Sequence, residues 1–587
     1  MREMVIDGFL VPTMMQKAWG SAFRGYRELK RVCDENGLKV FATWGTLLGA
    51  VRHHGFIPWD DDIDVCMLRK DYDRLLETVG REGSGYHIED YVSTGTDNMV
   101  RRWVEKSILI YPPEEWEERS GFPFGDVIDI FIMDSLPSDE KKQKKVMEVI
   151  ADHQRRRNEA DSIEKKTEIT QELDRYLSTL AESEDNDQVV DLLYYGGNKA
   201  RILPKEWFDE AVELPFMDGT MSVPAKYREV LERYFGDYRK PVIVFGAHGY
   251  PFYEKYLGQL KERFEFEFPR FSCTQAQYDS VMSERTEKVT LSELLLSMAG
   301  VLSDAHRDLS ASENREFAAD LLMQCQQLAI DVGGEVERRA VDSSGIIEVL
   351  EAYCDDIYKT HERARSGIGS SFGRILSDAE NSTLQGYEDR LRALADRNTA
   401  EKKEVLFLSL SAKDMERVSG LREKYCSEPD VHVSVVALPY KDKDAMGLIP
   451  DGEWSVDTEG YPDEVELTPF DQYDLEAMHP DVVVYQTPYD EFCDGYTIHP
   501  YFYSKNVRKY CDELVFAMSY ELMEIVEADF RSRYTLGTFI CNPGVIYADR
   551  MLVLTEKMKR VCEEILWKWC ADGEMKAQSA VKIEVSK

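Results

Sequence analysis

The sequence contains no apolar run long enough to cross a bilayer, and it does not open with the charged and apolar segments of a secretion signal. Its 11 cysteines form no CxxC pair and follow no regular spacing, which argues against a disulfide framework and favours free thiols in a reducing compartment. We therefore expect a cytoplasmic protein, with at most a peripheral association with the inner face of a membrane.

Basic residues are scarce, since 72 Lys and Arg stand against 110 Asp and Glu, a formal net charge of -38. Such a chain has little long-range attraction for nucleic acid or anionic lipid, so nucleic acid is not an expected partner. Any phosphate that the protein binds must be held locally, by a metal ion, by backbone amides or by a few placed Arg and Lys side chains.

The chain has 587 residues, more than a single hydrophobic core normally accommodates. Its secondary-structure pattern changes twice along the sequence. Residues 1–265 alternate helical and strand patterns, beginning with an amphipathic helix at 11–36, which predicts a small mixed sheet flanked by helices. Residues 266–400 are typical of a helical connecting region. From 401 to 587, nearly all-apolar strands such as "EVLFLSL" and "DVVVYQTP" predict a Rossmann-like α/β domain with buried parallel strands.

The stretch "FATWGTLLGAVRHHGFIPWDDDIDV", residues 41–65, contains the aspartates Asp60, Asp61, Asp62 and Asp64. Strand alternation would place Asp62 and Asp64 on one face, where they can share Mg²⁺ or Mn²⁺, hard cations that prefer oxygen ligands. Asp60 is a candidate auxiliary ligand, and we expect Asp61 to point away. The alternative is a solvated turn whose aspartates cap the following helix.

The surroundings of this cluster favour a phosphate site over a solvated turn. Gly45 and Thr46 lie at a predicted strand-to-helix junction, where backbone amides and the helix dipole suit a phosphate. Arg52 follows on the same helix and could reach a phosphate oxygen. The strand pattern "DVIDIF" supplies Asp129 as a third carboxylate.

At this point the chain resembles a known family. "GTLLGAVRHHGFIPWDDDIDV" is similar to the signature of the LicD family, which also includes the fukutin-type ribitol-phosphate transferases. "VIDIFIMDSLP" and "LPFMDGTMSVPAKYREVLERYFGDYRKP" resemble further family segments in the expected order. The resemblance covers roughly residues 15–260 and implies a nucleotidyltransferase-like α+β fold for the N-terminal domain.

The resemblance also implies an activity. LicD-type proteins transfer phosphocholine, or in relatives a polyol phosphate, from a CDP-linked donor to a hydroxyl of a cell-surface glycan, such as teichoic acid, or of its lipid-linked precursor. The acceptor oxygen attacks the β-phosphorus and CMP leaves, so catalysis rests on positioning and charge neutralisation. The expected cofactor is Mg²⁺ or Mn²⁺, the expected partners are the CDP-alcohol and the glycan acceptor, and a homo-oligomer stays open.

Residue roles follow by matching positions to the family. Asp62 and Asp64 would hold the metal, with Asp60 as an auxiliary ligand. Asp129 would complete the metal shell or act as general base, and these two roles stay open. Gly45 and Thr46 would contact the donor phosphate, and Arg52 would bind there and neutralise charge in the transition state. Lys106 and His248 are further candidates for binding the donor; the alternatives are that Lys106 is solvated and that His248 is structural.

The C-terminal part and the transferred alcohol are less determined. Residues 401–565 resemble the N-terminal Rossmann-like part of the CDP-glycerol glycerophosphotransferases, and we do not expect a complete second transferase. A choline group would need an aromatic cage, for which Trp44, Trp59, Trp103 and Phe124 are candidate walls. Two other functions stay open: a nucleotidyltransferase that uses CTP, and a catalytically silent scaffold in surface-glycan assembly.

Overall fold

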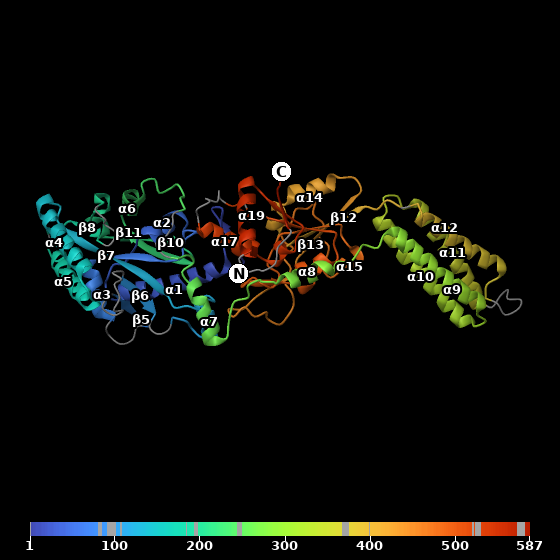
Figure 1. Ribbon diagram of the computed structural model, residues 1–587, viewed down its shortest axis with the longest axis horizontal. Coiled ribbons are helices and arrows are strands. Elements are labelled where there is room, and N and C mark those ends of the chain that lie inside the picture. The colour runs from blue at the N-terminus through green and yellow to red at the C-terminus, as the bar shows by residue number, and fades with distance from the viewer. Residues whose placement is uncertain are drawn as a thin grey trace.

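The computed structural model describes residues 2–79, 85–90, 101–105, 109–183, 185–192, 198–243, 249–366, 375–397, 399–518, 520, 522, 530–571 and 581–586. Figure 1 shows a mixed sheet with helices at one end of the molecule, a parallel sheet in the middle and a helical bundle at the other end. The chain is therefore mixed α/β with several sheets, as the sequence predicts. The domain bounds near residues 265 and 400 stay predictions.

The N-terminal sheet is mixed and has β4 and β7 as its parallel centre. Its strands run in the order β3-β4-β7-β6-β5, and β8 pairs with both β7 and β9. The strands are β3 (Phe41–Ala42), β4 (Asp64–Leu68), β5 (Tyr86–Glu89), β6 (Arg101–Glu105), β7 (Val127–Leu136), β8 (Gln188–Asp191) and β9 (Leu203–Pro204).

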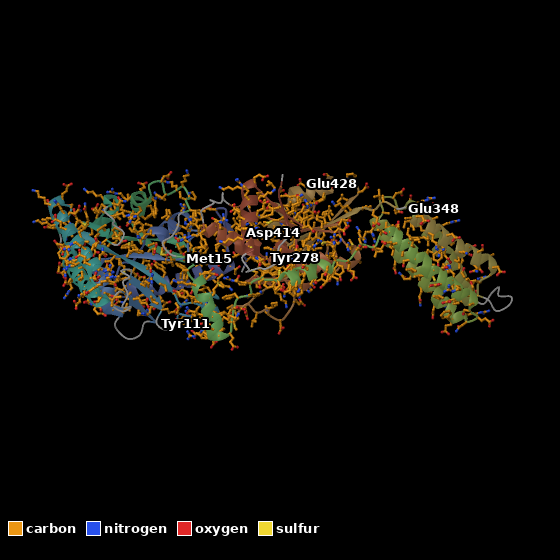
Figure 2. All side chains as sticks on the ribbon, viewed as in Figure 1. Met15, Tyr111, Tyr278, Glu348, Asp414 and Glu428 are labelled. Carbon is orange, nitrogen blue, oxygen red and sulfur yellow. The ribbon has the colours of Figure 1, made fainter. Side chains whose placement is uncertain are left out.

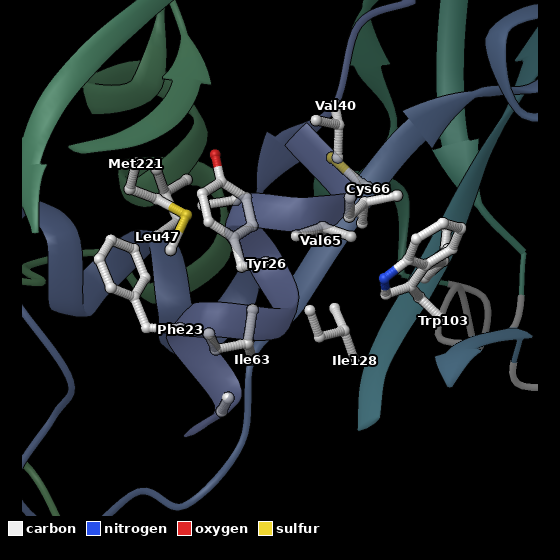
Figure 3. Close-up of a cluster of buried hydrophobic side chains, with 14 of the residues drawn as sticks. Phe23, Tyr26, Val40, Leu47, Ile63, Val65, Cys66, Trp103, Ile128 and Met221 are labelled. Carbon is white, nitrogen blue, oxygen red and sulfur yellow. The ribbon is translucent and has the colours of Figure 1, made fainter. Parts of the chain in front are cut away.

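The core of this unit forms because helix α1 (Thr13–Glu35) lays one apolar face on the sheet. Phe23, Tyr26 and Leu29 recur at helical spacing and are buried, as the sequence pattern predicts. Figure 3 shows Phe23 and Tyr26 in one buried cluster with strand residues such as Val65 and Ile128. The helix ends at Glu35, just before the "NG" turn at 36–37.

Further helices and two hairpins surround the N-terminal sheet. Helix α2 (Trp44–Arg52) begins two residues earlier than "TLLGAVRHHG" suggests, and its first turn lies beside the start of β4. The other helices are α3 (Arg69–Val79), α4 (Glu140–Glu159), α5 (Ile163–Ala181), α6 (Tyr227–Phe235) and α7 (Leu257–Phe264). The hairpins are β1–β2 (Met4–Ile6, Phe9–Val11) and β10–β11 (Ala211–Phe216, Gly219–Pro224).

The bundle consists of the helices α9 (Leu291–Ala311), α10 (Arg315–Arg339), α11 (Ser344–Ser366) and α12 (Asp378–Ala395). Its apolar interior contains one polar layer. The His306 ring bonds the Glu388 carboxylate at 2.7 Å through Nδ1 and the Tyr353 hydroxyl at 2.9 Å through Nε2. Because these groups come from three helices and are buried, their hydrogen bonds set the relative positions of those helices along the bundle.

We expect the bundle to lose stability as the pH falls from 7 to 5. Burial lowers the pKa of His306 below its usual 6.5, although Glu388 opposes the shift. The unfolded chain therefore takes up the proton first, at a cost of about 1.4 kcal/mol per unit of pKa difference. Thermal melts of the full chain should show this slope, and His306→Gln should flatten it. Equal slopes for both chains would contradict the assignment.

The C-terminal sheet is wholly parallel, in the order β13-β12-β15-β17-β18-β19. Its apolar strands are buried, as continuous runs such as "EVLFLSL" predict. The strands are β12 (Lys403–Ser409), β13 (Val431–Ala437), β15 (Val482–Tyr485), β17 (Glu513–Ala517), β18 (Arg550–Val553) and β19 (Lys582–Val585). A separate small pair joins β14 (Tyr440–Asp442) to β16 (Tyr496–Ile498).

Helices cover the C-terminal sheet, and one of them comes from outside residues 401–587. Tyr278 of α8 (Gln275–Ser283) stacks on Tyr547 with ring centroids 6.1 Å apart, and Figure 2 places it beside this sheet, away from Glu348 on the bundle. The other helices are α13 (Ala412–Arg417), α14 (Ser419–Ser427), α15 (Leu475–Met478), α16 (Ser504–Lys509), α17 (Phe530–Ile540), α18 (Pro543–Ile546) and α19 (Glu556–Ala571).

Across the described ranges, no helix combines the length and the apolar character needed to span a bilayer.

Candidate functional site

Two of the predicted carboxylates meet at the centre of the N-terminal sheet. Asp64 is the first residue of β4, and its parallel partner on β7 is Asp129. Asp62 lies just before the strand rather than in it. The structure thus brings Asp64 next to Asp129, 65 positions further along the chain, because the two strands pair in this register.

The other aspartates gather immediately before β4. Carboxylate oxygens of Asp60, Asp61 and Asp62 all lie within 4.8 Å of one another, a spacing that could hold a cation. The expectation that Asp61 points away is wrong. Asp61 is buried, and its Oδ2 accepts a hydrogen bond of 2.7 Å from the backbone N–H of Phe252. A loop, not a strand, carries residues 60–62, so strict alternation does not apply there.

Like charges make this cluster electrostatically costly. Burial raises the pKa of Asp64 well above its usual range, and the charges of Asp62, Asp129, Asp60 and Asp191 raise it further. Asp191 is the last residue of β8 and is buried. The sequence analysis missed it, although an aspartate that ends the apolar strand pattern "QVVD" was a usable signal.

The first turn of α2 is tied to the aspartate segment. The Thr46 hydroxyl accepts a 2.8 Å hydrogen bond from the backbone N–H of Asp64. Gly45 lies so close to Asp60 that an added Cβ would fall under 3.0 Å from the Asp60 Oδ2. The two residues predicted to contact donor phosphate therefore lie beside the carboxylates.

We expect Gly45→Ala to lower turnover about tenfold or more with little loss of stability. The new methyl group would displace the end of the Asp60 side chain, which can move without disturbing the backbone. Such a displacement misplaces a reacting group, for which losses of about 10²-fold are known. Gly49→Ala is the contrast, since its Cβ would meet the backbone oxygen of Gly55 and should lower the melting temperature. Wild-type turnover in Gly45→Ala would contradict the packing argument.

A cation that the sequence analysis missed faces Asp129. Arg102 on β6 is the antiparallel partner of Asp129, and its Nε donates a 2.9 Å hydrogen bond to Asp129 Oδ1. The Arg102 side chain is 39% exposed, so it reaches both the carboxylate and solvent. Only the pairing of β6 with β7 reveals this neighbour, because nothing local in "RRWVE" distinguishes Arg102 from Arg101.

Arg52 is not brought to the aspartates. It ends α2, about 9 Å along the helix axis from Thr46 at about 1.5 Å per residue. Its Nη1 donates a 3.1 Å hydrogen bond to the Tyr238 carbonyl. Arg52 lies at the other end of α2 from Gly45 and Thr46, and its role at a phosphate stays a prediction. Lys106 and His248 lie outside the described residues.

A cavity of about 480 Å³ opens beside the carboxylates. One part of its wall is charged and includes Asp61, Asp62, Asp129, Arg102 and Glu254. The other part is aromatic and consists of Phe122, Phe124, Tyr250, Phe252, Tyr256 and Phe530.

Of the aromatic residues that the sequence suggested as cage walls, Phe124 lines this cavity. Trp103 is fully buried and stacks on Tyr86 with centroids 5.1 Å apart. Trp44 stacks on Tyr234, and Trp59 packs edge-on against Phe9. The three tryptophans serve packing and do not line this cavity, so they are not candidates for its aromatic wall.

Comparison with known proteins supports the resemblance. The family described as LicD/FKTN/FKRP, nucleotidyltransferase domain, matches residues 37–135. The lipopolysaccharide cholinephosphotransferase LicD of Haemophilus influenzae is 27% identical over 228 residues, which cover 36% of this chain and 85% of that protein. Residues 37–135 therefore resemble the nucleotidyltransferase domain of the LicD family.

Two further proteins match this chain over shorter segments. Uncharacterized proteins of Rickettsia prowazekii and Rickettsia typhi are 35% and 39% identical over 69 and 51 residues, and the matches cover 26% and 16% of those proteins. The segment that matches the LicD family, residues 37–135, includes the aspartates 60–64, Arg102 and Asp129. The family match ends well before the bundle and the C-terminal sheet.

Proposed function

We propose that this protein transfers phosphocholine from CDP-choline to a hydroxyl of a cell-surface glycan or its lipid-linked precursor and releases CMP. The supporting observation is one cavity that joins a carboxylate cluster to an aromatic wall. The Haemophilus influenzae relative is named as a lipopolysaccharide cholinephosphotransferase, and the proposed transfer of phosphocholine to a glycan is the same type of reaction.

The carboxylate cluster fits a divalent cation. Three carboxylate oxygens lie within 4.8 Å of one another, and burial of Asp64 among like charges needs a compensating positive charge. Asp60, Asp62 and Asp64 would hold Mg²⁺ or Mn²⁺, with Asp129 or Asp61 completing the set. When bound, such an ion neutralises charge on the diphosphate of the donor.

The side chains of the site would then position the two reactants. Backbone amides at the start of α2, near Gly45 and Thr46, would bind the diphosphate. Arg102 holds the Asp129 carboxylate in place, so Asp129 can accept the proton of the acceptor hydroxyl as its oxygen attacks the β-phosphorus. The bond to the α-phosphate oxygen breaks, and CMP carries that oxygen away.

The aromatic wall favours choline over a polyol as the transferred alcohol. A quaternary ammonium is attracted by aromatic faces, and each contact contributes about 0.5–2 kcal/mol. The cavity also contains more carboxylates than cationic side chains, which disfavours anions and suits a cation. A polyol would instead need many hydrogen-bonding side chains, whereas rings form much of this wall.

Incubation of the full chain with CDP-choline, CDP-glycerol, CDP-ribitol and CTP, each with and without Mg²⁺ and a glycan acceptor fraction, tests the proposal. We expect acceptor-dependent CMP release from CDP-choline in the presence of Mg²⁺. CMP release from CDP-glycerol or CDP-ribitol instead would support the same type of reaction with a different transferred alcohol. Pyrophosphate release from CTP would show a nucleotidyltransferase, and no release from any donor would leave a scaffold.

A further inference from the structure

Helix α17 (Phe530–Ile540) of the C-terminal unit reaches the carboxylate cluster of the N-terminal unit. Figure 1 shows α17 on the side of the C-terminal unit that faces the N-terminal sheet. Its first turn contacts the segment 59–62 and the cavity loop 249–256. The match to the LicD family, at residues 37–135, does not include α17.

Arg531 makes the central contact. Its Nη1 donates a hydrogen bond to the Trp59 carbonyl and lies 3.6 Å from Asp60 Oδ1. Its guanidinium also lies over the Tyr250 ring, 5.0 Å from the centroid. Arg531 is only 5% exposed, and a buried guanidinium costs several kcal/mol unless its partners compensate. Its partners are the aspartate segment and the cavity wall.

Two neighbours on the same helix face reach the same cavity. Phe530 forms part of the cavity wall. Tyr534, one turn further on, donates a 2.6 Å hydrogen bond to Glu254, whose carboxylate also lines the cavity. Residues i, i+1 and i+4 of a helix lie on adjoining parts of one face, so α17 presents a single surface to the site.

These contacts connect α17 to each side of the cluster. Arg531 touches one oxygen of Asp60, and Gly45 lies against the other. The loop that carries Tyr250 also carries Phe252, whose N–H binds Asp61. Movement of α17 would therefore move Asp60 and the cavity loop together.

We propose that α17 completes the transferase site, with Arg531 as a positioning residue for Asp60 and with Phe530 and Tyr534 as part of the substrate-cavity wall. The inference rests on the proposed function and adds that the C-terminal unit is a working part of that site. Partners that orient a metal-ligating carboxylate typically change metal affinity or activity by about 10–100-fold when altered.

Hydrogen exchange of the full chain, with and without MnCl₂ and CDP-choline, tests the inference. We expect both ligands together to slow exchange at residues 59–64 and also in α17, by about tenfold. Arg531→Lys keeps the charge but replaces the planar guanidinium with a single ammonium group. The slowing of exchange in α17 should therefore disappear in this variant. Arg533→Lys is the matched control, because Arg533 lies on the same helix but pairs with Glu564 at 2.9 Å.

Turnover gives a second readout. Arg531→Lys should lower kcat for CMP release by the folded protein about 10–100-fold, while Arg533→Lys keeps wild-type values. If Arg531→Lys does not fold, Phe530→Ala serves, since its ring is 55% exposed and its loss should raise KM for CDP-choline several-fold.

The outcomes separate the two proposals. Protection at residues 59–64 without any response in α17, or wild-type turnover in Arg531→Lys and Phe530→Ala, would overturn the role of α17 and leave the transferase intact. No protection at either place in a folded wild-type chain would overturn the transferase proposal and this inference with it.

Discussion

Replacing Asp64 with asparagine is expected to reduce CMP release on the order of 10³-fold, which corresponds to about 4 kcal/mol of transition-state stabilisation. Asp64 lies among the like charges of the cluster and pairs in register with Asp129. An amide keeps the shape of the side chain but loses the charge that would hold a divalent cation. Radiolabelled or chromatographic detection of CMP measures the loss.

The same substitution should stabilise the metal-free protein. Because the charges of Asp62, Asp129 and Asp60 all disfavour an ionised Asp64, an uncharged amide relieves that repulsion. We therefore expect a higher melting temperature for Asp64→Asn in EDTA, together with a smaller stabilisation by MnCl₂.

Asp134→Asn on β7 is the contrasting variant. Asp134 is buried, and it accepts a 2.7 Å hydrogen bond from Arg69 Nε. Loss of a buried ion-pair partner typically costs about 3–5 kcal/mol, so this chain should melt lower. Full turnover in Asp64→Asn, or destabilisation equal to that of Asp134→Asn, would refute the assignment of Asp64 to a cation site.

Arg102→Gln is expected to lower kcat about 10²-fold without a measurable change in folding stability. Arg102 donates to the Asp129 carboxylate at 2.9 Å, and removal of one such preorganised contact typically costs about 10²–10³-fold in kcat. Its side chain is 39% exposed, and an ion pair of this kind contributes only about 0–1 kcal/mol to stability. Steady-state kinetics and a thermal melt measure the two effects.

Arg101→Gln is the matched control for Arg102. The two residues are neighbours on β6, so their side chains point to opposite faces of the sheet. Arg101 is 5% exposed and pairs with Asp174 at 2.8 Å, away from the aspartate cluster. We expect it to lower stability by about 1.5–3 kcal/mol and to leave kcat of the folded protein near the wild-type value. The reverse pattern, with kcat lost only in Arg101→Gln, would show that Arg102 has no part in the site.

Local sequence patterns predicted much of the framework of the site. The spacing of Phe23, Tyr26 and Leu29 predicts α1, and the structure confirms it because one apolar face of a helix must pack on the sheet. The apolar runs from residue 401 onward predict parallel strands, which the structure also confirms. Asp62, Asp64 and Asp129 come from the same kind of reading and do lie together.

The errors share one physical cause. Short-range periodicity does not show which distant segments of the chain pack against a given residue. Asp61 was expected to point away, yet the Phe252 N–H of the loop at 249–256 donates a hydrogen bond to its carboxylate. Trp103 was offered as a cage wall, but it fills the core against Tyr86.

The sequence by itself determined the resemblance to the LicD family, the mixed α/β class and the carboxylates on β4 and β7, because these depend on motifs and on periodicity within single strands and helices. Only the tertiary structure decided which cations and aromatic rings surround those carboxylates. Arg102 reaches Asp129 through strand pairing, and Arg531 reaches Asp60 from more than 450 positions away. Contacts between distant segments follow from how whole units pack, and that packing is not encoded in any short stretch of the chain.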